Sequence, residues 1–283
     1  MIMKLYKYTD AKGLAILRDL TVKASRASEF NDPFELSPKI DASQFSRGKI
    51  RKALLEPERV ESWYRLVKAR GLVQNKKTFK KDFRRMRPEL IQNVLADLPG
   101  NVEHVRQDFA QRFDCHWRIF CVSKIRHSIL MWSHYADKHK GLVVEFDTAH
   151  PSLASWGDES CLEVEYLPQK ADFVFEARDS TAFERRLFAV ARRKSPEWEY
   201  EQEVRYILPA PSDGGVLFPI EPGAITGVIV GARASAELMD EVCRILSQPH
   251  FSHVTLERAV LSKDRFALEF VRLDPRLRRP QVG

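Results

Sequence analysis

The sequence predicts an α+β fold: one domain over residues 1–283 that carries a helical insertion at about residues 41–113. Short segments that alternate between apolar and polar residues, as strands do, lie on both sides of the insertion and are separated by short helical segments. Within the insertion, apolar residues recur at spacings of three and four, as at Phe79 and Phe83. A hydrophobic content of 44% is that of a folded globular protein.

The pattern of residues predicts each element in turn. Ahead of the insertion, residues 3–9 are typical of a strand, Thr9 or Asp10 can cap a helix that ends near Leu20, and residues 21–28 predict a second strand. Pro88 and the break at residues 98–100 are expected to divide the insertion into two or three helices. After it, helices are expected at about residues 128–137, 181–193 and 235–246, and strands at residues 117–123, 141–146, 162–167, 200–208, 216–220, 224–230, 253–260 and 265–271.

Several classes of protein are disfavoured by the composition. The chain has no run of 18 apolar residues, so no membrane span or membrane partner is expected, and residues 1–6 do not resemble a signal peptide. The four cysteines are widely spaced, without a C-x-x-C motif, which predicts reduced thiols and a cytoplasmic location. The sequence contains no G-x-S-x-G, P-loop or G-x-G-x-x-G motif, which argues against the usual hydrolase, kinase-like and Rossmann functions.

The positive charge is concentrated in one segment. Of the formal net charge of +7, residues 47–87 contribute 15 Lys and Arg against four acids, a local net charge of +11. Aromatic residues are interleaved there, and a basic patch with aromatics suits nucleic acid through phosphate attraction and base stacking. The alternative is an ordinary solvated helical face. The interleaved aromatics are Trp63, Tyr64, Phe79 and Phe83.

The most informative segment is the strand predicted at residues 200–208. Its alternation places Tyr200, Val204, Tyr206 and Leu208 on one face. The other face carries Glu201, Glu203 and Arg205, spaced roughly 7 Å apart along the strand. Two carboxylates on one face can address one ligand. The alternative is an exposed face whose Glu–Arg pair contributes well under about 1 kcal/mol.

Two further segments combine apolar and hydrogen-bonding residues. Phe30-Asn31-Asp32-Pro33-Phe34 predicts a turn whose flanking rings hold it in the core and fix its amides for ligand contacts, although Asn and Asp in turns commonly bond only local backbone. The helix at residues 128–137 carries Met131, Trp132, His134 and Tyr135. Its apolar members can line a slot for an aromatic ring or belong to the core, and its histidine can act as acid and base or be structural.

Taken in order, these segments resemble a widespread bacterial family of domains of unknown function, whose relatives include proteins linked to abortive phage resistance. The resemblance rests on Leu5-Tyr6-Lys7-Tyr8, on Phe30-Asn31-Asp32-Pro33-Phe34, on the run from Leu130 to Asp137 with Gly141 and Glu145-Phe146, and on Trp198-Glu199-Tyr200-Glu201-Gln202-Glu203. It covers most of the chain except the helical insertion.

The order of elements and the start of the chain also resemble the ADP-ribosyltransferase fold. This resemblance implies a mixed or antiparallel β core, NAD as substrate, Glu203 as the catalytic carboxylate and Glu201 as the first member of a Glu-x-Glu pair. Residues 192–196 would correspond to a loop that recognises the target. The first strand departs from the superfamily, because Tyr6, Lys7 and Tyr8 stand where His or Arg is usual.

Three functional hypotheses follow. The first is an NAD-consuming ADP-ribosyltransferase-like enzyme, a toxin or phage-defence effector that modifies nucleic acid or protein and has a protein target or an antitoxin as a possible protein partner. The second is a catalytically silent nucleotide or nucleic-acid binding module in phage defence, and the third is a nuclease that uses Asp32, Glu201 and Glu203 around a metal. For the first, no resident metal is expected, the catalytic residues are Glu203 and Glu201, and the residues expected to bind the cofactor are Tyr6, Lys7, Tyr8, Asn31, Asp32, Ser123, Met131, Trp132, His134, Tyr135 and Arg205.

Overall fold

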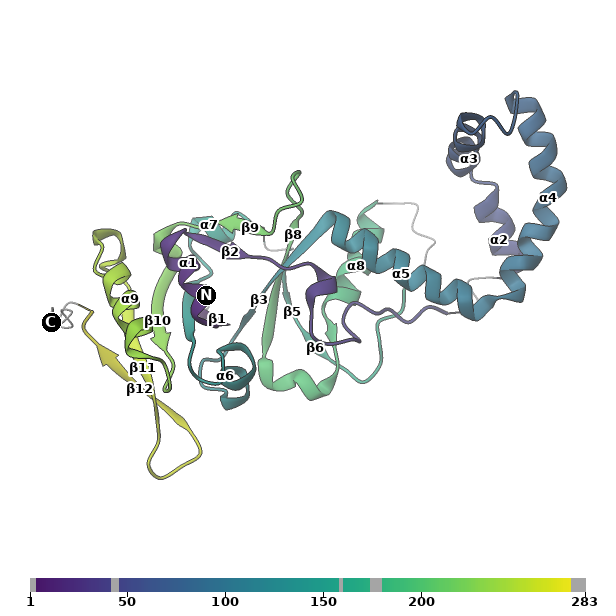
Figure 1. Cartoon of the computed structure of the whole chain (residues 1–283). Helices are drawn as coiled ribbons and strands as arrows, with labels where there is room; N and C mark the ends of the chain where they lie inside the picture. Colours follow the sequence, from purple (N-terminus) through teal and green to yellow (C-terminus); the bar gives the residue numbers. More distant parts are fainter. Residues whose placement is uncertain (1–3, 42–45, 158–159, 174–179, 276–283) are drawn as a thin grey trace. The chain divides into compact units, whose positions relative to one another are not determined.

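The chain folds into two compact units in a computed structural model that describes residues 4–41, 46–157, 160–173 and 180–275 (Figure 1). The first unit comprises Met1–Leu36, Arg112–Gln169 and Ala191–Gly283, and the second comprises Ser37–Gln111 and Lys170–Val190. The second unit therefore contains nearly all of the predicted helical insertion. It also contains most of the helix predicted near residues 181–193, which the sequence pattern did not group with the insertion.

The first unit is built on an eight-stranded sheet in the order β12-β11-β10-β4-β1-β3-β8-β5. All neighbouring strands are antiparallel except β10 and β11, which are parallel. The prediction of an α+β fold is confirmed, with a mixed sheet as its core. The strands are β1 (Lys4–Thr9), β3 (Trp117–Ser123), β4 (Leu142–Asp147), β5 (Cys161–Glu163), β8 (Glu203–Pro209), β10 (Ile225–Val230), β11 (Thr255–Leu261) and β12 (Leu268–Leu273).

Two small sheets and several helices complete this unit. β2 (Thr21–Lys23) pairs with β9 (Leu217–Pro219), and β6 (Glu165–Tyr166) pairs with β7 (Arg193–Lys194). The helices are α1 (Leu14–Arg18), α6 (Ile129–Tyr135), α7 (Pro151–Ala154) and α9 (Ala236–Leu246), with 3-10 turns at η1 (Ala11–Gly13), η2 (Ala27–Glu29), η5 (Pro196–Glu201), η6 (Pro222–Ala224) and η7 (Pro249–Phe251). Ser235 caps α9 by accepting a hydrogen bond from the Leu238 amide, as its position before an apolar run predicts.

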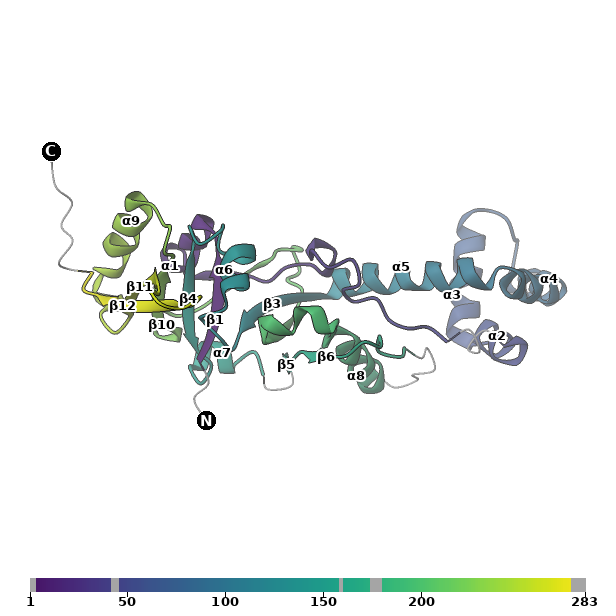
Figure 2. The same ribbon diagram turned by 90° about the horizontal axis from the view of Figure 1, so that it is seen from below.

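Alternation along the strands sorts their side chains between the two faces of the sheet. Val204 and Tyr206 of β8 belong to the larger core cluster, together with the buried residues of α9. Tyr8 of β1 belongs to a smaller cluster with Met131 and Trp132 of α6, which lies against β1 (Figure 2). Glu203 and Arg205, which alternate with the core residues of β8, therefore point away from the larger core.

Between β1 and β3 the sheet is almost split. The single paired position that the structure describes for these two strands is Tyr6 with Ser123. Further along β3, Ile119 pairs with Ser25 of the segment after β2 instead of with β1. The Lys7 ammonium reaches across this opening and donates a hydrogen bond to the Cys121 carbonyl at 3.0 Å. The two strands are thus joined by fewer backbone pairs than β1 and β4 or β3 and β8.

The second unit is helical in its described part. Its helices are α2 (Arg47–Leu54), α3 (Pro57–Ala69), α4 (Lys76–Ala96), most of α5 (Leu98–His116) and most of α8 (Ser180–Ala191). Aromatic rings join α3 to α4, with Trp63 edge-on to Phe83 and Tyr64 tilted against Phe79. The expectation that Pro88 would end a helix is wrong, because α4 continues through it. Figure 1 shows α4 curved along its length, in keeping with a proline in its interior.

Several predicted strands differ in extent from those of the structure. Residues 21–28 contain the short β2 and the turn η2, and residues 162–167 fall in two short strands that belong to different sheets. The strand expected at residues 200–208 begins only at Glu203, since residues 196–201 form a 3-10 turn that starts with Pro196. Among the helices of the described residues, none is both long and apolar enough to cross a bilayer. None of the four cysteines forms a disulfide.

Candidate functional site

A pocket of about 370 Å³ opens beside the split between β1 and β3, entirely within the first unit. Its volume falls within the range of small-molecule sites in proteins. It is lined by residues from β1, β3, α6, β8, the segment from Ser25 to Glu35 and the segment from β7 to η5. These residues are Tyr6, Lys7, Tyr8, Ser25, Glu29, Phe30, Asn31, Glu35, Ile119, Cys121, Val122, Ser123, Met131, His134, Tyr135, Lys194, Glu201, Glu203 and Arg205.

Arg205 is the most deeply buried charge of this pocket, with a side chain that is 0% exposed. Its Nε and Nη2 donate to the two carboxylate oxygens of Glu203, both at 2.9 Å. The third nitrogen, Nη1, lies 2.6 Å from Glu35 Oε1 and donates to the carbonyl of Ala191 at 2.5 Å. A buried guanidinium requires this degree of pairing, because an unpaired charge at such a position is strongly destabilising.

Lys194 lies at the centre of the carboxylates. Its Nζ donates to Glu201 Oε2 at 2.6 Å and to Glu203 Oε2 at 3.0 Å, and lies 3.7 Å from Glu35 Oε2. The ammonium also faces the ring of Trp198 at 5.0 Å from the ring centroid. The pocket thus holds three buried carboxylates against two paired cations, Lys194 and Arg205.

Glu201 joins this network to the helix α6. Its Oε1 accepts a hydrogen bond from the hydroxyl of Tyr135 at 2.6 Å, and the Asn31 amide nitrogen lies 3.5 Å from that hydroxyl. The backbone carbonyl of Glu201 accepts from Ser123 Oγ at 2.6 Å. Glu201 is therefore fixed at the wall of the pocket, with its carboxylate held by α6 and β7 and its backbone carbonyl by β3.

The pKa values of Glu201 in η5 and Glu203 in β8 are shifted in opposite directions. Burial raises the pKa of Glu201, and the nearby charge of Glu203 raises it further, while Lys194 opposes both. For Glu203, burial would also raise the pKa, but Arg205 and Lys194 outweigh it and hold the pKa well below its usual range. Environments that push two carboxyl pKa values apart are typical of acid–base sites.

The backbone at Gln202 explains how both carboxylates reach the same ammonium. Gln202 has a left-handed conformation, with φ of 43°, between the last residue of η5 and the first residue of β8. The prediction that Glu201 and Glu203 share one face of a continuous strand is therefore wrong, since Glu201 is not in the strand. They converge because the chain turns between them.

Eleven of the predicted site residues line the pocket together, although they come from five separate segments. They are Tyr6, Lys7, Tyr8, Asn31, Ser123, Met131, His134, Tyr135, Glu201, Glu203 and Arg205. The alternative of an exposed strand face for Glu203 and Arg205 is wrong, because both are buried.

Trp132 and Asp32 do not line the pocket, and for them the expected ligand contact is wrong. Trp132 is 0% exposed, packs edge-on against Tyr8 and donates its indole N–H to the Arg126 carbonyl, so it belongs to the core. Asp32 is also buried, and its Oδ1 accepts from the Phe34 amide within its own turn. The ring of Phe34 is 64% exposed and does not hold that turn in the core as predicted.

The sequence pattern missed Glu35 and misplaced Lys194. Glu35 follows the Asn-Asp-Pro turn, and nothing in its spacing marks it as a partner of Arg205. Lys194 was placed in a target-recognition loop at residues 192–196, but it lies in β7 with its side chain buried among the carboxylates.

The described residues contain no group of three His, Cys, Asp or Glu side chains arranged to hold a metal ion. Asp32 is engaged in its own turn, while Glu201 and Glu203 are paired with Lys194. The nuclease alternative, in which these three acids share a metal, gains no support from this arrangement.

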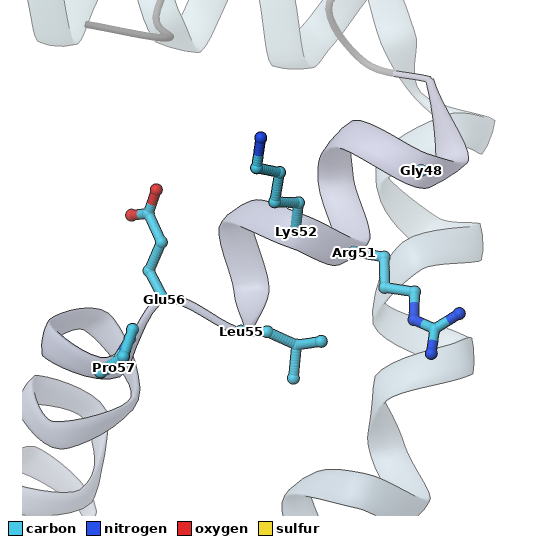
Figure 3. A pocket seen from close by; sticks show the side chains of 6 residues that line it. All are labelled: Gly48, Arg51, Lys52, Leu55, Glu56 and Pro57. Carbon is cyan, nitrogen blue, oxygen red and sulfur yellow. The ribbon is translucent and has the colours of Figure 1, made fainter. Parts of the chain in front are cut away.

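A second hollow, of about 400 Å³, lies in the second unit where α2 meets α3. It is lined by Gly48, Arg51, Lys52, Leu55, Glu56 and Pro57. Figure 3 shows Lys52 and Glu56 on one side of the chain and Arg51 and Leu55 on the other, so the polar groups do not converge on one point. This hollow has no buried polar group to fix a ligand, and the first unit holds the stronger candidate.

Comparison with known proteins adds one result. No curated protein and no solved structure matches the chain. Residues 131–206 match the model of a family described as "Protein of unknown function (DUF2971)". The part of the chain that runs from α6 to β8, and with it Tyr135, Lys194, Glu201, Glu203 and Arg205, is therefore similar to this family.

Proposed function

We propose that the pocket binds NAD through its nicotinamide and adjoining ribose and that the protein cleaves the bond between them. The ADP-ribosyl group would pass to water or to a nucleic-acid or protein acceptor, in a bacterial toxin or phage-defence effector, as the resemblance to ADP-ribosyltransferases implies. One observation carries the proposal: the carboxylates of Glu201 and Glu203 line one pocket of suitable volume together with three tyrosines from β1 and α6.

The chemistry requires a carboxylate at the ribose. Breaking the nicotinamide–ribose bond leaves its electron pair on the ring nitrogen and builds positive charge on the ribose, much as glycoside cleavage does. A fixed carboxylate that faces this charge stabilises the transition state. Water or an acceptor hydroxyl then forms the new bond to the ribose carbon and releases a proton.

We assign this role to Glu201 rather than to Glu203. Both oxygens of Glu203 are bound by Arg205, and one of them also by Lys194. Glu201 makes one hydrogen bond per oxygen, to Tyr135 and to Lys194, which leaves a lone pair on each oxygen for a ligand. Glu203 then acts as a positioning residue that holds Lys194, and the tyrosines and Met131 offer contacts for the nicotinamide ring.

The second candidate is a binding module that holds NAD or another nucleotide without cleaving it. The specific observation in its favour is that both carboxylates are already ion-paired, so neither faces the pocket as a free charge. The departure of β1 from the usual His or Arg, with Tyr6, Lys7 and Tyr8 in that strand, also impairs catalysis more than binding.

Release of nicotinamide from NAD, measured by chromatography with and without DNA, RNA and cell extract as acceptors, tests the proposal. We expect Glu201→Gln to lower the rate at least about 100-fold, because it removes the charge that stabilises the transition state. Glu163→Gln is the matched control, since Glu163 is an exposed carboxylate on β5 with a side chain that is 61% exposed, and it should leave the rate unchanged.

Calorimetric titration with NAD separates the two candidates. NAD binding without nicotinamide release under any condition would favour the binding module. If the protein neither binds NAD nor releases nicotinamide, both candidate functions are overturned. Equal loss of activity in Glu201→Gln and Glu163→Gln would remove Glu201 from its assigned role.

A further inference from the structure

The helix α4 of the second unit divides its residues by charge. With about 100° of rotation per residue, the positions before Pro88 separate into two halves of the helix circumference. Among residues 76–87, one half carries every Lys and Arg and no acid, and we call it the basic half. The other half, called the apolar half below, carries Thr78, Phe79, Asp82, Phe83 and Met86. The basic half consists of Lys76, Lys77, Lys80, Lys81, Arg84, Arg85 and Arg87.

The packing of α3 fixes which half faces outward. Phe79 is buried, and it stacks on Phe83 within α4. Both rings are in contact with rings of α3, Phe79 with Tyr64 and Phe83 with Trp63. The apolar half is therefore used for packing within this unit, and six of the seven basic residues are exposed while Arg87 is half-buried.

Most of these charges have no acidic partner. Lys76 pairs with Glu61 at 2.5 Å, and Arg85 lies 3.8 Å from Asp82. Within the described residues, the other five basic side chains of this half form no ion pair. These five are Lys77, Lys80, Lys81, Arg84 and Arg87.

We propose that the basic half of α4, from Lys76 to Arg87, is a docking surface for the sugar–phosphate backbone of a nucleic-acid duplex. Eleven residue steps along a helix rise about 16 Å. A duplex carries one negative charge per about 1.7 Å of its axis, so its surface presents a dense array of phosphates over that length. Five unpaired cations in a continuous stripe match this array of anions in sign and extent.

The packing of the aromatic residues indicates that α4 contacts the sugar–phosphate backbone of a nucleic acid and not its bases. The sequence pattern predicted base stacking by the rings interleaved among the basic residues. In the structure those rings pack against one another, so they are not available to stack on unpaired bases. The same packing argues against a membrane surface, because an interfacial helix must insert an apolar face that α4 has already buried.

Fluorescence anisotropy of labelled 20-base-pair DNA and RNA duplexes with the full-length protein, over a series of salt concentrations, tests this inference. The variant replaces Lys77, Lys80, Lys81 and Arg84 by Gln, which keeps helix propensity. We expect its affinity to fall at least tenfold at about 0.1 M salt and the slope of log K against log salt to decrease in magnitude by about three to four. Whichever duplex binds more tightly identifies the source of the phosphates.

The matched control replaces Lys12, Lys140, Lys263 and Arg265 by Gln, because these exposed residues of the first unit carry the same total charge. This variant should bind within about twofold of wild type, and circular dichroism should show unchanged helix content in both. The proposal is overturned if both variants lose affinity equally or if wild type binds neither duplex. It is also overturned if single strands, polyglutamate or phosphatidylserine vesicles bind as tightly as the duplexes. The assay contains no NAD, so its outcome is independent of the pocket.

Discussion

At the scale of single residues, Arg205 holds the charged network of the first unit together. Replacing it by Met would leave Glu203 and Glu35 buried without their main partner. We expect Arg205→Met to lower the free energy of unfolding by about 3–5 kcal/mol. Arg244→Met is the control, because Arg244 forms an exposed pair with Glu241 that should contribute little to stability. Urea unfolding compares the two, and equal small losses would show that the buried network contributes little to stability.

The pKa shifts of Glu201 and Glu203 predict opposite effects of pH on the free energy of unfolding. The pKa of Glu203 is held below its value of about 4.3 in the unfolded chain, so its contribution is present above that value and is lost as the pH falls. The pKa of Glu201 is raised, so its contribution falls as the pH rises above about 4.3. Glu203→Gln should therefore flatten the acid limb of a plot of stability against pH, and Glu201→Gln should steepen it. Urea midpoints between pH 3 and pH 7 measure both, and a change of the same sign in the two variants would contradict this assignment.

The sequence revealed the charged face of β8 but not the partners of its charges. Strand alternation predicts that Val204 and Tyr206 lie on the face opposite Glu203 and Arg205, and this is confirmed. Which side chains meet those charges depends on contacts with residues far away in the chain, such as Glu35. Local spacing carries no information on such contacts.

At the scale of elements, the left-handed residue Gln202 sets the geometry between η5 and β8. Glycine adopts this conformation without strain, whereas a β-branched residue does so at a cost. We expect Gln202→Gly to leave stability unchanged or raise it by up to about 1 kcal/mol, and Gln202→Val to lower it by about 1–2 kcal/mol. Thermal unfolding measures both changes. The same order for the exposed strand residue Glu163, replaced by Gly and by Val, would show that the backbone of Gln202 is not the cause.

Elements were predictable where the pattern is long and its ends carry clear signals. The strand β3 has the predicted limits, and the N-cap residues Ser128 and Ser235 begin their helices as expected. Pro88 misled the prediction because a proline weakens a helix without always ending it, and here the rings of α3 pack on the helix just before it. The strand at Glu203 began late because Pro196 favours a 3-10 turn over an extended start.

At the scale of the whole molecule, composition and periodicity predicted the class of fold but not its topology. The pairing of β1 with β3 and β4, or of β10 with β11, is a long-range choice that alternation does not encode. The grouping of α8 with the insertion is of the same kind, since residues 170–190 follow the insertion by about 60 residues in sequence. Most residues that line the candidate pocket could be singled out from the sequence because they belong to recognisable strands, turns and helices.

The narrow junction between β1 and β3 has a mechanical consequence. The strand order places five strands, from β12 to β1, on one side of this junction and three, from β3 to β5, on the other. Each group is tied internally by ladders of several pairs, whereas the described junction contains one. We therefore expect the sheet to bend more easily between β1 and β3 than within either group of strands. The pocket lies beside this junction, so a small change of twist between the two groups would alter its width. Amide hydrogens at the junction should exchange with solvent faster than those within β4.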